Sequence, residues 1–295
     1  MEYFIWTLMT IFILTILYFA VGAYAALMLT KVGDHPQYDR TPGSFGLAYE
    51  TIHFPSRGEQ LKLAAWYVPK EGAAQAVILV HGRNASKQNA ISGNFPKLAS
   101  ELHQAGYCVL VLDMRGHGES EGKRYTWGIQ EKKDILGAVD DLLSRGFEPG
   151  AIYVLGISLG GAGVLFAAAE EPAIGAVVVD STFASLDNLV KPNWREESGL
   201  PMFFLPSVHL MWKIVFGFSI KDVQPVAAIK AVNPRPILIF HSTSDEIIPV
   251  KHAHQLAEAA QQAHLFLFEQ GDHAELYRDH PQTYLKTLTE FLKSE

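Results

Sequence analysis

Short apolar runs alternate with amphipathic stretches along the chain from about residue 48 to its end. The runs have the length and composition of buried strands, and they lie at 76–80, 107–112, 152–155, 176–180, 236–241 and 265–268. The stretch at 134–144 and the one around 256–260 carry apolar residues at helical spacing. Because strands and helices alternate, we expect an α/β fold with a mostly parallel central sheet and helices on both faces, over residues 48–295.

The first thirty residues depart from this alternation. Residues 3–30 contain no charged side chain, and a helix of that length spans about 40 Å, more than the hydrocarbon core of a bilayer. The run predicts a single-pass transmembrane anchor at 3–30, followed by a Pro- and Gly-containing linker at 31–47. The alternative is a secretory signal, because Ala23-Tyr24-Ala25 resembles a cleavage site. Lys31 and Arg40 favour a cytoplasmic catalytic domain by the positive-inside rule.

A second apolar stretch lies between the strand ending at Asp180 and the one beginning at Pro236. This insertion, at about 183–232, is too long for an ordinary loop, and its middle is rich in Phe, Leu and Trp with Lys213 as the single charge between 198 and 220. Pro201 and Pro206 interrupt it, which argues against a second membrane span. We interpret it as a small helical lid with an apolar pocket, although its aromatic residues could equally serve only to pack the lid.

Composition and charge exclude several classes of protein. The net charge of −7 disfavours nucleic-acid binding, which requires clustered Lys and Arg. The lone cysteine, Cys108, lies inside a predicted strand and is interpreted as a core residue. Twelve histidines are present, but none has the spacing of a metal site. We expect no metal and no cofactor.

The first candidate for chemistry is a serine between a strand and a helix. The predicted strand from 152 runs directly into Gly156-Ile157-Ser158-Leu159-Gly160, and a small-residue helix follows. This pattern is typical of the nucleophile elbow, a turn so tight that the positions flanking the serine require glycine. The sequence therefore predicts Ser158 as a nucleophile.

A base and an acid stand on loops after later strands. His273 follows the run at 265–268, and histidine is the side chain whose ordinary pKa lies near neutral pH. Asp245 follows the run at 236–241 and would hold the imidazole in one tautomer. Asp180 is a rival acid because it also ends a strand. Asp272 is interpreted as solvated.

The remaining requirement is a pair of backbone donors for an oxyanion. One is expected from Leu159, directly after the serine, and the other from Arg83, on the loop after the strand at 76–80. The Arg83 side chain could also meet an anionic substrate. We interpret Asp113 and His117, on the loop after 107–112, as residues that brace that loop.

Together these motifs resemble a known superfamily. They stand in the order of the α/β-hydrolases: His81-Gly82, 113–120, 156–160, 180–185, the Asp245 loop and 271–273. Over about residues 48–295 the sequence most resembles membrane-anchored, small-lid serine hydrolases, the Bem46-like group related to the serine aminopeptidase family. The resemblance implies Ser158 as nucleophile, Asp245 as acid and His273 as base. One departure, His241-Ser242 in place of His-Gly, is expected to have little effect.

We therefore expect a serine hydrolase that cleaves carboxylic esters or thioesters through an acyl-enzyme. An apolar lid beside a membrane anchor favours a lipophilic, lipid-like acyl substrate. The alternative is an aminopeptidase or amidase that uses the same triad, with an anionic subsite for a free amine. Candidate carboxylates for that subsite are Glu196, Glu197 and Glu246.

Overall fold

The computed structural model describes residues 1–34, 36 and 38–294. These residues form two compact units, one made of 1–31 and 185–223, the other of 32–184 and 224–295. Residues 35 and 37 of the predicted linker, and residue 295 at the end of the predicted hydrolase domain, lie outside the described residues.

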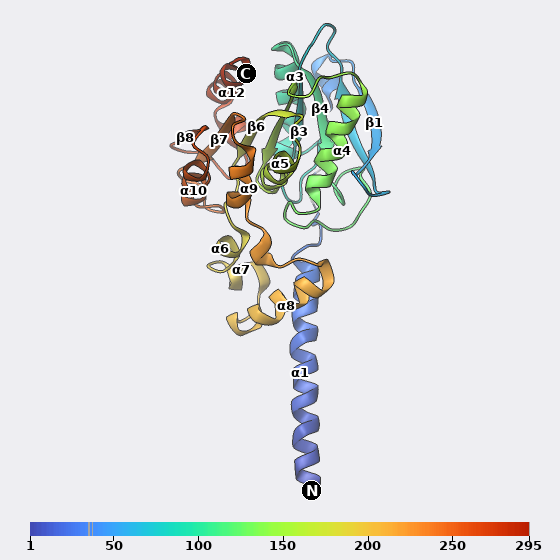
Figure 1. Ribbon diagram of the computed structural model, residues 1–295, viewed down its shortest axis with the longest axis vertical. Coiled ribbons are helices and arrows are strands. Elements are labelled where there is room, and N and C mark those ends of the chain that lie inside the picture. Colours follow the sequence, from blue (N-terminus) through green and yellow to red (C-terminus); the bar gives the residue numbers. More distant parts are fainter. Residues whose placement is uncertain (35, 37, 295) are drawn as a thin grey trace. The chain divides into compact units, whose positions relative to one another are not determined.

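The larger unit contains a sheet that has eight strands within the described residues (Figure 1). They are β1 (Glu50–Pro55), β2 (Lys62–Val68), β3 (Ala76–Val80), β4 (Cys108–Asp113), β5 (Ile152–Ile157), β6 (Ile174–Asp180), β7 (Ile237–Ser242) and β8 (Ala263–Phe268). Their order across the sheet is β1-β2-β4-β3-β5-β6-β7-β8. Only β2 runs antiparallel to its neighbours, so the carboxyl ends of β3 to β8 meet at one edge, where open α/β sheets place their ligand sites.

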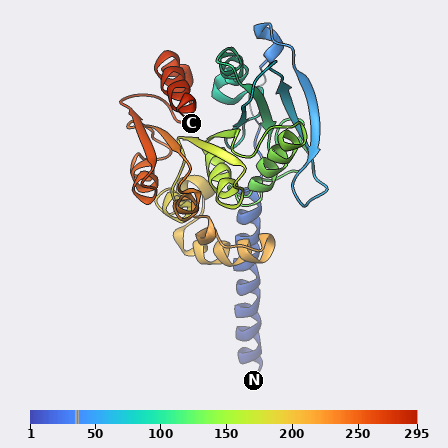
Figure 2. The same cartoon turned by 45° about the horizontal axis from the view of Figure 1, so that its top comes forward.

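Helices cover both faces of this sheet (Figure 2). The longer helices of this unit are α3 (Phe95–Gln104), α4 (Glu131–Ser144), α5 (Leu159–Glu170), α9 (Pro225–Val232), α10 (Lys251–Ala259) and α12 (Pro281–Lys293). Its short helices are η1 (Pro42–Phe45), α2 (Ala90–Gly93) and α11 (Leu276–Asp279). Helices α3 and α12 pack on one face, where their apolar residues join a continuous core with β3, β4 and β5. Helices α4, α5, α9 and α10 form the layer on the other face. The predicted α/β-hydrolase arrangement, a mostly parallel sheet between two helical layers, is confirmed.

The smaller unit combines the N-terminal helix with most of the predicted insertion. It contains α1 (Glu2–Met28), α6 (Leu186–Val190), α7 (Trp194–Ser198), η2 (Met202–Phe204), α8 (Leu205–Phe216) and η3 (Ile220–Asp222). The last helix of the expected insertion, α9, belongs to the larger unit, where it packs against α5.

Helix α1 is long and apolar enough to cross a membrane. Its most apolar window has a mean hydropathy of 2.3, and none of that window is buried. Residues 3–17 are exposed, whereas Gly22, Ala25 and Ala26 are buried. An exposed surface of this kind is stable in lipid and unfavourable in water.

Candidate functional site

Ser158 occupies a strained turn between β5 and α5. Its φ of 53° and ψ of −116° are values that residues other than glycine rarely adopt. The turn is held by the Ser158 N–H, which donates to the carbonyl of Asp180 at 2.8 Å. Strain of this kind is concentrated at functional sites, and here it lifts the hydroxyl from the end of the strand.

The glycines around Ser158 are required by close backbone contacts. A Cβ at position 160 would lie 2.3 Å from the carbonyl oxygen of His81, and one at position 156 would lie 2.6 Å from the carbonyl oxygen of Gly160. These distances are too short for any side chain. The glycine spacing read from the sequence therefore corresponds to real steric limits at the elbow.

Three distant side chains meet at the carboxyl edge of the sheet. His273 Nε2 lies 2.9 Å from Ser158 Oγ, and His273 Nδ1 lies 2.8 Å from Asp245 Oδ2. The Asp245 carboxylate can only accept, so Nδ1 carries the proton and Nε2 is left to accept the serine hydroxyl proton. This is the geometry of a serine activated by a general base.

Asp245 is held as an anion at the back of this arrangement. Its side chain is fully buried, and its Oδ1 accepts the N–H groups of Ile247 at 2.9 Å and Ile248 at 2.8 Å. Burial alone would raise the pKa of Asp245, but the hydrogen bonds from His273 and Ile248 outweigh it and hold that pKa below its ordinary value. Asp245 therefore remains ionised at neutral pH.

The rival acid, Asp180, is engaged elsewhere. It accepts hydrogen bonds from Ser181 Oγ at 2.8 Å and from the Tyr284 hydroxyl at 3.1 Å. Ser181 Oγ in turn accepts the N–H of Ala274, the residue after His273, at 3.3 Å. Burial raises the pKa of Asp180 from 3.8 to about 7. Asp180 thus holds the loop that carries His273, while Asp245 contacts the imidazole.

The raised pKa of Asp180 predicts a pH-dependent stability. Because the folded protein binds this proton more tightly than the unfolded chain, Asp180 favours folding below about pH 4 and loses that contribution as the pH rises toward about 7, at about 1.4 kcal/mol per pH unit. We expect Asp180→Asn, which keeps an acceptor oxygen for one of the two hydroxyls and offers its NH₂ to the other, to flatten the decline. Thermal unfolding of the detergent-solubilised full chain between pH 5 and 8 measures this. Equal declines in both proteins would contradict the expectation.

The two residues predicted to supply oxyanion donors belong to different loops. Leu159 is the first residue of α5, and Arg83 follows Gly82, where a Cβ would lie 3.3 Å from Ser158 Cβ. His81 holds this second loop, since its Nδ1 donates to the Gly82 carbonyl at 2.7 Å and its Nε2 accepts the Met114 N–H at 3.1 Å. The Arg83 guanidinium lies 5.2 Å from the centre of the Trp127 ring, a cation–π contact that orients its side chain.

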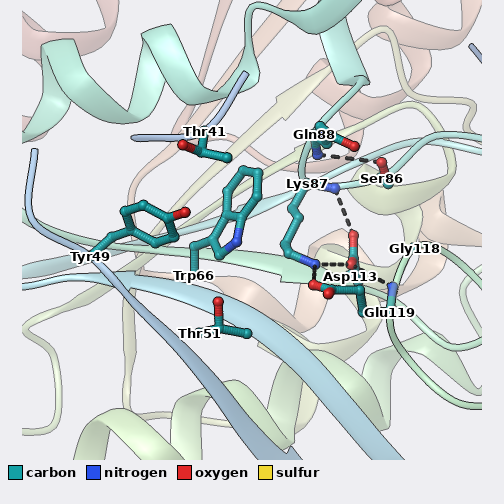
Figure 3. A pocket seen from close by; sticks show the side chains of 10 residues that line it. All are labelled: Thr41, Tyr49, Thr51, Trp66, Ser86, Lys87, Gln88, Asp113, Gly118 and Glu119. Atoms are coloured by element: carbon teal, nitrogen blue, oxygen red, sulfur yellow. Dashed lines mark hydrogen bonds and ion pairs between the residues drawn. The ribbon is translucent and has the colours of Figure 1, made fainter. Parts of the chain in front are cut away.

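A separate charged cluster braces the loops after β3 and β4 (Figure 3). Lys87, almost fully buried, forms ion pairs with both Asp113 and Glu119, and its ammonium lies 5.2 Å from the centre of the Trp66 ring. Asp113 also accepts the N–H groups of Lys87 and Glu119, as expected for a loop-bracing residue. The cluster lines a cavity of about 480 Å³ whose described lining includes none of Ser158, Asp245 and His273. Sequence reasoning missed Lys87, because a loop lysine is ordinarily solvated.

Two further residues, His117 and Asp272, were predicted from the sequence to have no catalytic role. His117 Nε2 accepts the N–H of Asn84 at 3.2 Å, and its Nδ1 lies 2.9 Å from the Arg115 carbonyl, so it too joins neighbouring loops. Asp272 is largely exposed and forms an ion pair with Arg278. Within the described residues, His, Cys, Asp and Glu form no group of three or more that could hold a metal ion.

Comparison with known proteins agrees with the α/β-hydrolase fold described above. A family model described as "Serine aminopeptidase, S33" matches residues 71–235, more than half of the chain. The chain is 30% identical to protein YqkD of Bacillus subtilis, over 78% of this chain and 75% of that protein. It is 26% identical to a monoglyceride lipase of Mus musculus, over 85% and 91% of the two chains. The solved esterase Pf2001 of Pyrococcus furiosus superposes with a TM-score of 0.71 at 21% identity, covering 89% of this chain and 99% of that one, which establishes the shared fold.

Proposed function

Because this chain belongs to the serine aminopeptidase S33 family of α/β-hydrolases, we propose that it is a serine hydrolase that cleaves carboxylic ester or thioester bonds through an acyl-enzyme. The observation that carries the proposal is the continuous line of hydrogen bonds from Ser158 Oγ through His273 to Asp245. This line supplies a nucleophile, a base and an orienting anion within contact of one another.

The first half of the reaction forms the acyl-enzyme. Ser158 Oγ attacks the substrate carbonyl carbon as His273 Nε2 takes the hydroxyl proton. Asp245 stabilises the imidazolium that results. The tetrahedral intermediate collapses when the protonated His273 gives its proton to the leaving alcohol or thiol, which leaves the acyl group on Ser158.

The second half returns the enzyme to its starting state. A water molecule gives a proton to His273 and attacks the acyl carbon, and the carboxylic acid departs as Ser158 regains its proton. In both halves the negative carbonyl oxygen is held by the backbone N–H groups of Leu159 and Arg83. The tight contact between Gly82 and Ser158 and the position of Leu159 at the start of α5 support this role.

A lipophilic acyl group is the substrate class we propose. Residues 198–220 carry one charge, Lys213, among many aromatic and aliphatic side chains, and α1 gives the chain a means of residing at a membrane where such substrates concentrate. The name of the mouse relative, a monoglyceride lipase, points in the same direction. We further propose that the catalytic unit faces the cytoplasm, because Lys31 and Arg40 follow α1 while Glu2 lies at its opposite end.

A series of p-nitrophenyl esters tests the substrate class. We expect the purified full-length protein to show a kcat/KM that rises from acetyl to medium or long acyl chains, because each added methylene group buried by the enzyme strengthens binding. The Ser158→Ala protein, prepared in parallel, serves as the blank for contaminating esterases. A strict preference for acetyl would contradict a lipophilic acyl site.

The second candidate function is hydrolysis of an aminoacyl amide by the same triad. The description of the matching family as a serine aminopeptidase favours it. It requires a carboxylate that pairs with a free amine, and Glu196, Glu197 and Glu246 remain the candidates. In the same preparations, turnover of aminoacyl-coumarin amides above that of acyl esters would favour this function over the first.

A further inference from the structure

Exposed apolar side chains are concentrated in one segment beyond α1. Among the described residues after 28, large hydrophobic side chains are exposed at Met202, Phe203, Leu210, Ile214 and Val215, and elsewhere only at Ile247. All five belong to η2 and α8 in the smaller unit. A concentration of this kind marks a surface that is covered by something other than water.

Helix α8 is apolar on both of its faces. Leu205, Val208 and Trp212 lie on the face that is buried. The exposed positions at the spacing of the opposite face are Pro206, Leu210, Lys213 and Ile214. A helix on an aqueous surface carries mostly polar residues outward, whereas here one lysine stands among apolar residues.

This segment packs directly on α1, within the same unit. A Cβ at Gly22 would lie 2.7 Å from Ser207 Oγ, so the two helices meet at a glycine, as helices that associate in membranes commonly do. The Tyr18 ring stacks on those of Phe203 and Phe204 at 6.0 and 5.4 Å, and its hydroxyl donates to the Phe203 carbonyl at 2.8 Å. Figure 1 shows α8 lying across the C-terminal part of α1.

The position of this contact along α1 sets the depth at which α8 would lie in a bilayer that α1 crosses. About twenty helical residues cross a hydrocarbon core of about 30 Å, so a span that begins near Tyr3 ends near Gly22. Tyr18 and Gly22 then lie where the hydrocarbon gives way to the headgroups, a level that tyrosine favours. Phe203 and α8, which contact them, lie at the same level.

We propose that residues 202–216 form a second membrane-contact element, an interfacial helix that α1 holds in the surface of the bilayer. Its apolar face enters the acyl-chain boundary, and Lys213 extends its ammonium toward lipid phosphates. The occupant is lipid because the exposed apolar face continues that of α1. The proposal depends on α1 crossing the membrane and is independent of the chemistry at Ser158.

Depth measurements on the full-length protein in phosphatidylcholine and phosphatidylglycerol nanodiscs test this proposal. In a Cys108→Ser background, an environment-sensitive fluorophore is attached at Leu210→Cys or Ile214→Cys, and at Glu196→Cys as an exposed control in the same unit. We expect blue-shifted emission, quenching by lipids with brominated acyl chains and loss of iodide quenching at 210 and 214. Position 196 should show the reverse. Iodide access at 210 and 214 equal to that at 196 would overturn the proposal.

Two further experiments identify what covers the exposed face of α8 and whether α1 holds this helix in place. Shielding that disappears when each nanodisc holds a single chain would assign the face to a second copy and overturn lipid contact. Gly22→Leu places a side chain where Ser207 lies, so we expect it to move the label at 210 toward water, while Ala20→Leu, at an exposed position, leaves it in place. An unchanged label in Gly22→Leu would show that α1 does not hold the segment. Because these readings need no turnover, they hold in Ser158→Ala as well.

Discussion

Ser158→Ala is expected to abolish labelling by a fluorophosphonate probe and to reduce ester turnover by a factor of about 10⁴ to 10⁶. The probe reacts with a serine only when a base removes its proton, and His273 Nε2 is the base 2.9 Å from Ser158 Oγ. Without the hydroxyl no acyl-enzyme forms, and only the weak contribution of oxyanion stabilisation and substrate binding remains. Gel fluorescence of the labelled chain and steady-state hydrolysis measure the two losses.

The control for this substitution is Ser144→Ala, at the exposed end of α4, which should label as the unmodified protein does. The alanine at 158 keeps the Cβ and therefore the backbone strain of the turn, and it removes only the hydroxyl, so the unfolding temperature should stay close to that of the unmodified protein. Labelling that persists in Ser158→Ala would overturn the assignment of the nucleophile.

The elbow and the parallel strands could be predicted because each has a local signal. Gly156 is required by a backbone contact within the turn itself, and Gly160 by the carbonyl of His81 on the neighbouring loop. The runs that became β3 to β7 are almost entirely buried on both faces and are therefore largely apolar. β1 at the antiparallel edge has no such signal. Five of its six residues are not fully buried, so its sequence carries little of the pattern that identifies a strand.

The choice between Asp180 and Asp245 could not be settled by spacing, because both follow parallel strands. The structure distinguishes the two by their hydrogen-bond partners. Asp180 accepts hydrogen bonds from Ser181 and from Tyr284 of α12, whereas the loop after β8 brings His273 to Asp245. The same limit applies to Lys87, whose two carboxylate partners lie 26 and 32 residues away. Contacts of this range depend on how the loops meet, which local pattern does not encode.

The grouping of α1 with residues 185–223 is likewise a long-range result. The contact of Tyr18 with Phe203 joins residues 185 positions apart. Gly22, with Ala25 and Ala26 shortly after it, was the available sequence signal of close helix packing, and a few small residues are a weak signal. A segment that the sequence predicts to be a lid on the hydrolase therefore shares a compact unit with α1.

Asp245→Asn is expected to lower kcat by a factor of about 10⁴ while leaving the protein folded. An asparagine oxygen can still accept from Ile247 and Ile248, so the loop keeps its hydrogen bonds. Its amide NH₂, however, would face His273 Nδ1 and favour the tautomer with the proton on Nε2, which cannot accept from Ser158. The substitution removes the base without removing the imidazole, and the acyl-ester assay measures the loss.

Asp180→Asn is the matched control, since it makes the same chemical change in the neighbouring buried carboxyl group. Asp180 bonds Ser181 and Tyr284, so its substitution should reduce kcat far less than Asp245→Asn does. A larger loss at 180 than at 245 would reverse the assignment of the acid. Because the Asp245 pKa lies below its ordinary value, the unmodified enzyme keeps this anion through the neutral range, and raising the pH does not restore a carboxylate to Asp245→Asn. A loss that persists at alkaline pH would thus trace to the missing charge and the wrong tautomer, and a recovery there would contradict both.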